Sequence, residues 1–217
     1  ACKAGQQRRF PGPAFAAELP QSAELRYSGS YGIPAVMTFT RNGNNYKIVS
    51  NIKVPLYSIR FESGGTISGN TLRPTYYKDV RSGKTYAEAR FSGGKVTYGK
   101  PGEQKTESVA GPTMDLFTLA WQLAANDAKL PAGLKITNGK KLYNVGGLSP
   151  AGSSQFSIAG GRTTVNKYRG HRGDSTVNYA FAPAFNNIPA QISYSDDGKT
   201  YDLKLTSVKI NGQTVKP

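Results

Sequence analysis

Residues 35–54 read AVMTFTRNGNNYKIVSNIKV, and the alternation in this stretch decides the fold. Apolar side chains such as Met37, Phe39 and Ile48 alternate with polar ones on both sides of the Asn42-Gly43 pair. A period of two is typical of a strand with one buried face. A two-residue loop between antiparallel strands needs positive φ, which Asn and Gly tolerate. The stretch therefore predicts a β-hairpin that turns at Asn42-Gly43.

Further Gly-centred pairs occur at hairpin spacing along the rest of the chain. They are Gly64-Gly65, Ser82-Gly83, Gly93-Gly94, Asn138-Gly139, Gly160-Gly161 and Asp197-Gly198. Most are flanked by short runs of Val, Ile, Thr, Tyr and Phe, so together they predict about eleven to thirteen antiparallel strands. Open edges of so large a sheet invite unwanted pairing. We therefore expect a mostly all-β fold in which an antiparallel meander forms a β-barrel or a strongly curled sheet.

The first strand is expected within residues 23–31, with Leu25, Tyr27 and Tyr31 on its inward face. Several other inward positions carry small residues. They are Gly29, Ala35, Ala87 and Ala89. Small inward residues leave room in a barrel, and either a ligand or a helix can occupy that room.

One segment, between residues 113 and 129, departs from the strand pattern. Pro112 or Thr113 can open a helix here, and Asp115 would lie in its first turn, where the helix dipole favours an anion. Residues 116–124 are apolar on most sides of such a helix, so other parts of the chain must cover it. We expect one apolar α-helix near residues 113–129, lying across the mouth of the barrel or in its interior.

The 217 residues suit one large β domain. We assign residues 22–217 to that domain and residues 1–21 to a flexible N-terminal tail. The tail contains Cys2, the only cysteine, so the sequence offers no internal disulfide and no thiol metal site. A cysteine near an N-terminus is compatible with a lipid anchor, but Ala1 precedes it without an apolar leader, so we favour an incidental residue.

Charge is the second strong feature, because 28 Lys and Arg against 13 Asp and Glu give a net charge of +15. Such a field favours anionic partners, which include anionic lipids, acidic glycans and envelope proteins, and it is compatible with peripheral membrane contact. The cations are dispersed through the predicted strands and form no single tract, which argues against a nucleic-acid partner. The alternative, that the charge serves solubility alone, stays open.

The residues needed for catalysis are scarce. His171 is the only histidine, its neighbours are cationic, and no G-x-S-x-G element supplies a serine nucleophile. Turn chemistry beside Gly198 explains the Asp196-Asp197 pair. The tripeptide Arg172-Gly173-Asp174 matches an integrin-binding motif, but three-residue matches arise often by chance. We therefore predict no enzymatic activity, no catalytic residue, no cofactor and no metal site.

Basic and aromatic side chains recur together on the predicted strands. Arg presents paired donors to phosphate or carboxylate, and Tyr presents a flat face to sugars or lipid head groups. The candidate ligand-binding residues are Arg60, Arg73, Tyr76, Tyr86, Arg90, Tyr168, Arg169 and Arg172. The competing explanation, which the sequence favours, is an ordinary solvated face on which Tyr and Arg pair across strands.

Several segments together resemble a family of bacterial envelope proteins. They are Leu25-Arg26-Tyr27 with Tyr31-Gly32-Ile33-Pro34, Leu72-Arg73-Pro74, Asp115-Leu116 to Leu123, Pro189-Ala190-Gln191-Ile192, Asp196-Asp197-Gly198 and Leu203-Lys204-Leu205-Thr206-Ser207. Their order and spacing, from residue 23 to 209, resemble the uncharacterised periplasmic family labelled domain of unknown function 3108. The resemblance implies an exported, single-domain, β-barrel-like protein of a Gram-negative bacterium, and it implies no catalytic residue.

Our leading expectation is a non-enzymatic periplasmic protein that binds an anionic or amphipathic ligand, either lipid or glycan. The alternative is a structural or interaction protein that docks on another envelope component through a basic, Tyr-rich face. An empty apolar cavity would favour the ligand carrier, whereas a filled interior with an exposed apolar patch would favour docking. The oligomeric state leaves no signal in the sequence.

Overall fold

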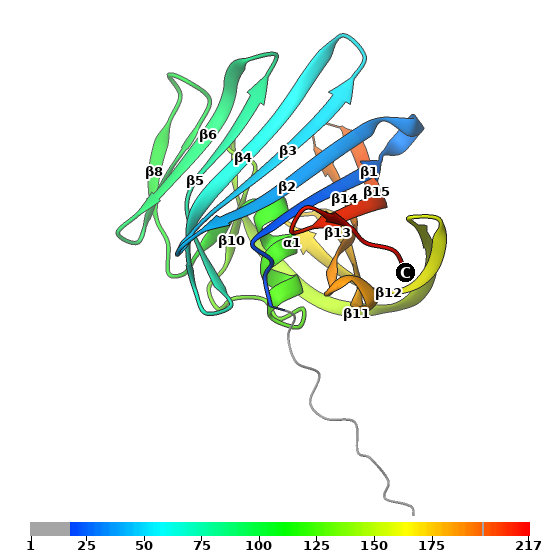
Figure 1. Cartoon of the computed structure of the whole chain (residues 1–217). Helices are drawn as coiled ribbons and strands as arrows, with labels where there is room; N and C mark the ends of the chain where they lie inside the picture. The colour runs from blue at the N-terminus through cyan, green and yellow to red at the C-terminus, as the bar shows by residue number, and fades with distance from the viewer. Residues whose placement is uncertain (1–17, 197) are drawn as a thin grey trace, which may run out of the picture.

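Antiparallel strands joined by tight turns make up most of the protein, whose computed structural model describes residues 18–196 and 198–217 (Figure 1). The first eight strands are β1 (Ser22–Ser28), β2 (Pro34–Asn42), β3 (Asn45–Val54), β4 (Tyr57–Ser68), β5 (Thr71–Arg81), β6 (Lys84–Ser92), β7 (Lys95–Gly99) and β8 (Lys105–Ser108). The others are β9 (Thr113–Met114), β10 (Lys135–Thr137), β11 (Leu142–Ile158), β12 (Gly161–Arg172), β13 (Ser175–Ala182), β14 (Ile188–Asp196), β15 (Lys199–Ile210) and β16 (Gln213–Thr214). The helices are α1 (Leu116–Ala125) and the short 3-10 turns η1 (Ser30–Gly32) and η2 (Pro183–Phe185).

The described strands form one 16-stranded sheet, more strands than the sequence predicts. Its hydrogen-bonded order runs from β8 through β7 to β1, then through β15 and β14 down to β9, with β16 attached to β15. Neighbours pair antiparallel except β9 and β10, which are parallel. The predicted antiparallel meander with one helix is confirmed. The predicted barrel or strongly curled sheet is not formed, because the path ends at β8 and β9 without pairing them.

Most of the predicted hairpins are confirmed, beginning with the one quoted above, whose loop is Gly43-Asn44, one residue later than predicted, because Asn42 pairs with Asn45. Asp197 of the predicted Asp197-Gly198 turn lies outside the described residues. Phe39 of β2 lies opposite Ile48 of β3, and Gly43 adopts a φ of 60° in the turn. Gly64-Gly65 is the exception, since both residues lie inside β4 at a register shift. A Cβ on Gly65 would lie 2.0 Å from the carbonyl oxygen of Arg73, so this pair allows a close approach of strands, not a turn.

Because successive strands alternate in direction, alternate connections lie at the same end of the sheet. We call the end at the top of Figure 1 the upper rim; it carries the β1–β2, β3–β4, β5–β6, β7–β8, β10–β11, β12–β13 and β14–β15 connections. The β2–β3, β4–β5, β6–β7 and β11–β12 connections lie at the lower end, where the N-terminal segment also enters β1. Leu19, in the segment expected to be a tail, is buried, and residues 1–17 with Cys2 lie outside the described residues.

The helix begins later than the sequence predicts. Residues 113 and 114 pair as β9 with β10, so Asp115 becomes the N-cap, not a first-turn residue. Its carboxylate accepts backbone hydrogen bonds from Phe117 at 3.0 Å and Thr118 at 3.2 Å, and the Thr118 hydroxyl also donates to it. These bonds satisfy amide groups that the first helical turn leaves free. The helix ends at Ala125, four residues before the predicted end.

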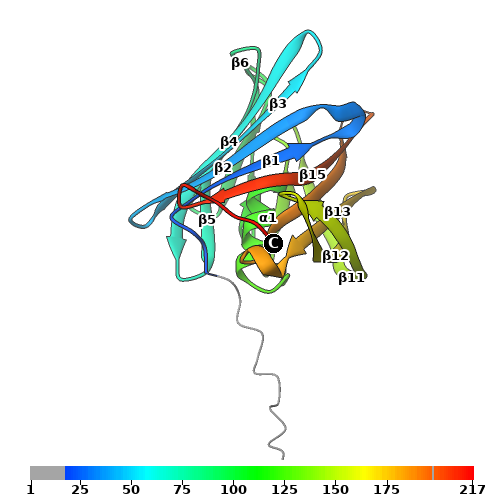
Figure 2. The same ribbon diagram turned by 45° about the vertical axis from the view of Figure 1, so that its right-hand side comes forward.

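All ten residues of α1 are buried, because strands from both halves of the sheet contact the helix. The halves are β1–β8, from which β3 and β5 contact α1, and β9–β16, from which β14 does. Figure 2 shows α1 between β3–β5 and the strands around β13. Trp121 is 1% exposed, and its ring centroid lies 4.7 Å from that of Phe39 in β2. The Tyr179 hydroxyl of β13 donates to the carbonyl of Leu116 at 2.6 Å, and the Gln122 side chain accepts from the β5 backbone. The helix is therefore held by packing and by hydrogen bonds to both halves.

Little space remains around the helix. The cavities beside it, near Phe117 and near Leu119, measure about 20 and 10 Å³. A cavity of that size holds one water molecule at most. The small residue Ala87 makes room for neither a ligand nor the helix but for the β10–β11 turn, since a Cβ on Gly139 would be 3.0 Å from its Cβ. In the described ranges, no helix has the length and apolar character to cross a bilayer.

The buried N-cap predicts a pH-dependent stability. Burial raises the pKa of Asp115 above its ordinary value, although hydrogen bonds from Thr118 and Phe117 oppose the shift. Because the folded-state pKa is raised, Asp115 adds most to the free energy of unfolding below its unfolded pKa of about 3.9. That contribution is lost as the pH rises through the folded-state pKa. Asp115→Asn keeps a capping oxygen but does not titrate. In denaturant titrations from pH 7 to pH 4, we expect wild type to gain stability relative to Asp115→Asn; a constant or shrinking difference would contradict this.

Candidate functional site

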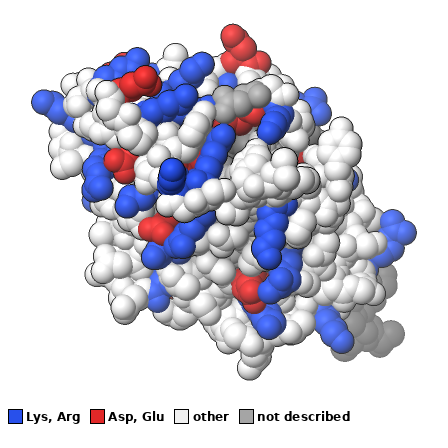
Figure 3. All heavy atoms as spheres, turned by 90° about the horizontal axis from the view of Figure 1, so that it is seen from above, with Lys and Arg blue, Asp and Glu red and all other residues white. Residues whose placement is uncertain are grey.

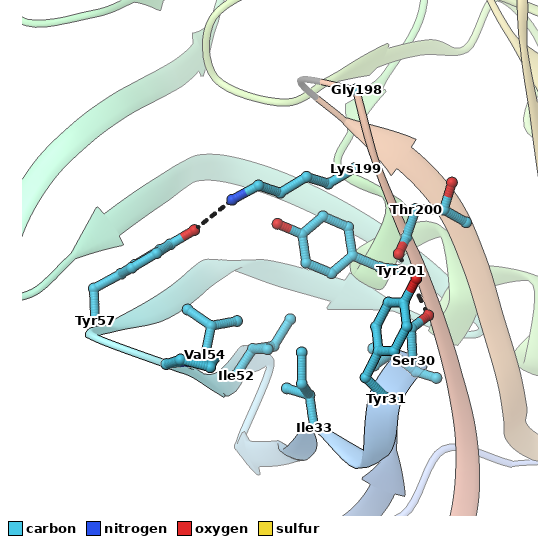
Figure 4. A pocket seen from close by; sticks show the side chains of 13 residues that line it. Ser30, Tyr31, Ile33, Ile52, Val54, Tyr57, Gly198, Lys199, Thr200 and Tyr201 are labelled. Carbon is cyan, nitrogen blue, oxygen red and sulfur yellow. Dashed lines mark hydrogen bonds between the residues drawn. The ribbon is translucent and has the colours of Figure 1, made fainter.

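A large hollow lies at the upper rim. A pocket of about 820 Å³ opens between the β1–β2 connection, the β3–β4 turn and the start of β15 (Figure 4). These three elements are brought together because β1 pairs with both β2 and β15, and β3 follows β2. The pocket thus lies above the filled interior, at the mouth of the sheet.

Gly29 and Ser30 fix the β1–β2 connection, which forms one wall of the pocket, against β15. The Gly29 amide donates to the Ile33 carbonyl at 2.6 Å, which closes the loop around η1. A Cβ on Gly29 would lie 3.1 Å from Leu203 Cδ2, so glycine lets this loop approach β15 closely. The Ser30 hydroxyl donates to the Thr200 carbonyl at 3.4 Å and accepts from the Asp202 amide at 3.3 Å. The loop is therefore fixed against β15 by two hydrogen bonds.

The chemistry of the lining is mixed. Its aliphatic part comes from Ile33, Ile52, Val54, Pro55 and Leu203. Its polar part comes from Ser30, Thr200, three tyrosines (Tyr31, Tyr57 and Tyr201) and Lys199. The described lining contains no carboxylate, so its charge is positive.

Lys199 reaches across the pocket. Its ammonium group donates to the Tyr57 hydroxyl at 3.1 Å, and Figure 4 shows the side chain extending from β15 towards β4 with Val54 and Ile52 below it. The Tyr57 hydroxyl raises the pKa of Lys199, so the lysine stays cationic. Burial raises the pKa of Tyr201, so its hydroxyl stays neutral and can donate. The opening therefore presents one cation and several hydroxyl groups above an aliphatic floor.

Two bulky residues project from the edge of this pocket. Tyr31, expected on the inward face of the first strand, instead follows the end of β1 and is 101% exposed. Leu56, between Pro55 and Tyr57, is 104% exposed. Their φ values are 59° and 77°, in the left-handed region where a Cβ costs about 1–2 kcal/mol. Both residues therefore occupy strained, fully exposed positions that glycine would fill more stably.

A second pocket, of about 530 Å³, lies at the lower end between β5, the β6–β7 turn and residues 109–114. Its lining includes Phe91, Val109 and Met114 together with Arg73 and Lys95. Arg73 is thus the one predicted binding residue that lines a sizeable pocket. The pocket is smaller than the first and is bordered by no fully exposed apolar side chain among the described residues.

Three predicted residues share the outer face of β4–β6. Arg60 donates to Glu62 at 2.7 Å, the Tyr76 hydroxyl donates to Glu62 at 2.8 Å, and Arg90 lies opposite Tyr76 in register. Burial pushes the pKa of Glu62 up, but Tyr76, Lys47 and Arg60 outweigh it, so this pKa is lowered. Glu62 is therefore a carboxylate that offsets part of the positive charge of this face.

Tyr86 and Arg172 lie where the two halves of the sheet meet near the upper rim. The Arg81 guanidinium lies 3.8 Å from the Tyr86 ring centroid, and Lys140 lies 5.4 Å from it. Arg172 is 4% exposed; it donates to the Ser195 carbonyl at 2.6 Å and lies 3.8 Å from Asp196. Lys140, in the β10–β11 connection, thus contacts β6 across the edge where β8 and β9 do not pair, whereas Arg172 contacts β14 of its own half. The burial of Arg172 takes one residue of the integrin-type tripeptide off the surface, while Gly173 and Asp174 stay exposed.

The remaining predicted residues lie on β12, away from the pocket. Tyr168 packs against Phe181 with ring centroids 5.9 Å apart, and Arg169 donates to Asn178 at 3.2 Å. His171 of the same strand is exposed. The predicted set therefore does not form one site.

The pocket residues were missed because the sequence analysis had no turn at Pro55-Leu56 and treated Tyr31 as inward. A usable signal exists in Pro55-Leu56, since proline at the second turn position commonly precedes a residue with positive φ. Lys199 could be placed only through the pairing of β15 with β1, which joins segments distant in sequence. In the described residues, no three His, Cys, Asp or Glu side chains are grouped to hold a metal ion.

Comparison with known proteins gives a family and a fold. Residues 25–210 match the family described as protein of unknown function DUF3108, and the chain belongs to this family. The crystal structure of a β-barrel-like protein of domain of unknown function DUF1849 from Brucella abortus is similar, with a TM-score of 0.50 and 8% sequence identity. The similarity covers 90% of this chain and 99% of that chain, and at this identity it shows the fold alone. No curated protein matches the chain.

The strained backbone at Leu56 predicts that glycine is better for stability. Leu56→Gly should raise the free energy of unfolding by about 0.5–1 kcal/mol, because glycine adopts positive φ without a Cβ clash. Leu56→Ala is the matched control, since it removes the same apolar surface but keeps the clash; it should stay within about 0.5 kcal/mol of wild type. Chemical denaturation measures both, and a glycine variant no more stable than the alanine variant would refute the strain.

Proposed function

We propose that this DUF3108 protein is an exported, non-enzymatic protein of the Gram-negative periplasm that binds an anionic amphipathic ligand in the upper-rim pocket. The observation that carries the proposal is the lining: a cationic Lys199 and several hydroxyl groups stand over an aliphatic floor, and none of the described lining residues is a carboxylate. Such a lining suits a molecule with an anionic head and an apolar tail. The periplasmic location is the one that the family resemblance implies.

The shape of the pocket supports a lipid-like ligand over a glycan. The floor, formed by Ile33, Ile52 and Leu203, offers branched aliphatic surface. The three lining tyrosines could also stack on a sugar, but the aliphatic side chains of this floor match an acyl chain. Binding in this pocket does not require a closed barrel around the ligand, because the ligand would lie in the mouth of the sheet, above α1.

The alternative function is docking on an envelope component through the outer face of β4–β6. Arg60, Tyr76 and Arg90 lie together there, which supports it. However, Glu62 already binds Arg60 and Tyr76 within this face, which reduces what the two can offer an anionic partner. The lining residues that the structure describes include no such acid, so we favour the pocket.

The proposal predicts specific losses of binding to lysophosphatidylglycerol, used as a monomeric probe below its micellar concentration and measured by calorimetry. Val54→Trp fills the pocket and should lower affinity at least about tenfold. Lys199→Glu should lower it by up to about tenfold, while leaving affinity for an uncharged monoacylglycerol unchanged.

Arg73→Ser, in the second pocket, is the matched control and should bind as wild type. Melting curves identify variants that fail to fold. The proposal is overturned if wild type does not bind the probe, or if Arg73→Ser loses binding while Val54→Trp keeps it.

A further inference from the structure

Tyr31 and Leu56 are the only fully exposed large apolar side chains among the described residues. Single exposed apolar residues are common on protein surfaces. Here both lie at the edge of the same pocket, although 25 positions separate them in sequence: Tyr31 belongs to its lining, and Leu56 lies between two lining residues. Both also stand at backbone positions that disfavour a bulky side chain. Their shared location indicates a surface that uses them.

The surrounding rim is rich in exposed lysines. They are Lys53, Lys84, Lys100, Lys141 and Lys199, one at or beside each of five upper-rim connections. Figure 3 views the molecule from above and shows Lys and Arg side chains spread over this face with fewer acidic ones. Exposed acids on the same rim are Glu103 in the β7–β8 connection and Asp174 in the β12–β13 turn, whereas Asp79 and Asp196 contact Arg81 and Arg172. A planar anionic partner could therefore meet several cations at once.

We infer that the upper rim docks on the surface of an anionic lipid bilayer, with Leu56 and Tyr31 inserted at the level of the head groups. Tyrosine is suited to that interface because its ring is apolar and its hydroxyl group is polar. The lysines would contact anionic lipid phosphates, which attract basic residues near the surface. Two inserted side chains give reversible binding, not permanent anchoring.

A bilayer fits these features better than a folded partner does. A stable protein interface needs a contiguous, well-packed apolar core. The rim instead offers two separate apolar residues on different turns, spaced by cations and by an open pocket. Isolated apolar residues among lysines match a fluid surface, which adjusts its own shape.

This docking would place the pocket opening against the membrane. If the proposed ligand binding holds, an amphiphile could pass between bilayer and pocket while its head remains near Lys199. That transfer rests on the proposed function, whereas the docking itself does not.

The test is flotation of the full chain with vesicles of phosphatidylethanolamine and phosphatidylglycerol, and with phosphatidylcholine vesicles as the uncharged comparison. Wild type should bind the anionic vesicles and lose binding as salt rises to physiological strength. Leu56→Ser should bind them about tenfold more weakly, yet bind monomeric lysophosphatidylglycerol as wild type does, because Leu56 is not part of the pocket lining. The double variant Tyr31→Ser with Leu56→Ser should bind vesicles more weakly still.

Two double variants with the same charge change test whether the position of the lysines matters for vesicle binding. Lys53→Glu with Lys84→Glu changes the upper rim, and Lys95→Glu with Lys129→Glu makes the same charge change at exposed positions of the lower end. Only the first pair should reduce vesicle binding strongly. Equal losses would show that net charge alone attracts the protein and would overturn the rim as a docking surface.

Insertion is measured directly with an environment-sensitive fluorophore on Leu56→Cys, in a Cys2→Ser background. Its emission should shift to the blue on anionic vesicles, whereas a label on Lys95→Cys should not shift. Absence of the shift at position 56, or vesicle binding unaffected by Leu56→Ser, overturns the inference while leaving ligand binding standing. Loss of lysolipid binding alone would overturn the proposed function and leave the docking intact.

Discussion

The structure depends on the burial of a helix that is apolar on nearly every side. α1 cannot face water, and a sheet that met only one side of it would leave the other exposed. Both halves of the sheet therefore pack on it. Asp115 and Tyr179 hydrogen-bond to backbone groups at its N-terminal end, and its own Gln122 accepts from the β5 backbone. The helix fills the interior, and the two pockets of about 820 and 530 Å³ lie towards the ends of the sheet.

The sheet is held around the helix without a closed ladder. Its terminal strands, β8 and β9, do not pair. Near the upper rim Lys140 contacts Tyr86 of β6 and Asp196 of β14 and so joins the two halves, while Arg81 contacts Tyr86 and Arg172 contacts Asp196 within one half each. These contacts use two residues that sequence analysis assigned to ligand binding. Arg172 and Tyr86 serve packing within the fold here, which explains why the basic-aromatic pattern alone was a poor guide to a site.

Local rules predicted much of the fold, and tertiary contacts decided the rest. Alternation and turn chemistry gave the hairpin around Asn42-Gly43 and the apolar helix. They failed at Gly64-Gly65, where strand proximity and not a turn requires glycine, and at Tyr31, which alternation placed inward. The pocket could not be predicted because β15 joins β1 across most of the chain. No local signal reports such a pairing.

The central claim is that an anionic amphiphile lies in the mouth of the sheet and not beside the helix. A crystal structure of the protein with bound lysophosphatidylglycerol tests this most directly. The account predicts electron density for the acyl chain along Ile52 and Leu203, with the phosphate near Lys199. Density between α1 and the sheet, or in the pocket lined by Phe91 and Met114 at the lower end, would contradict it.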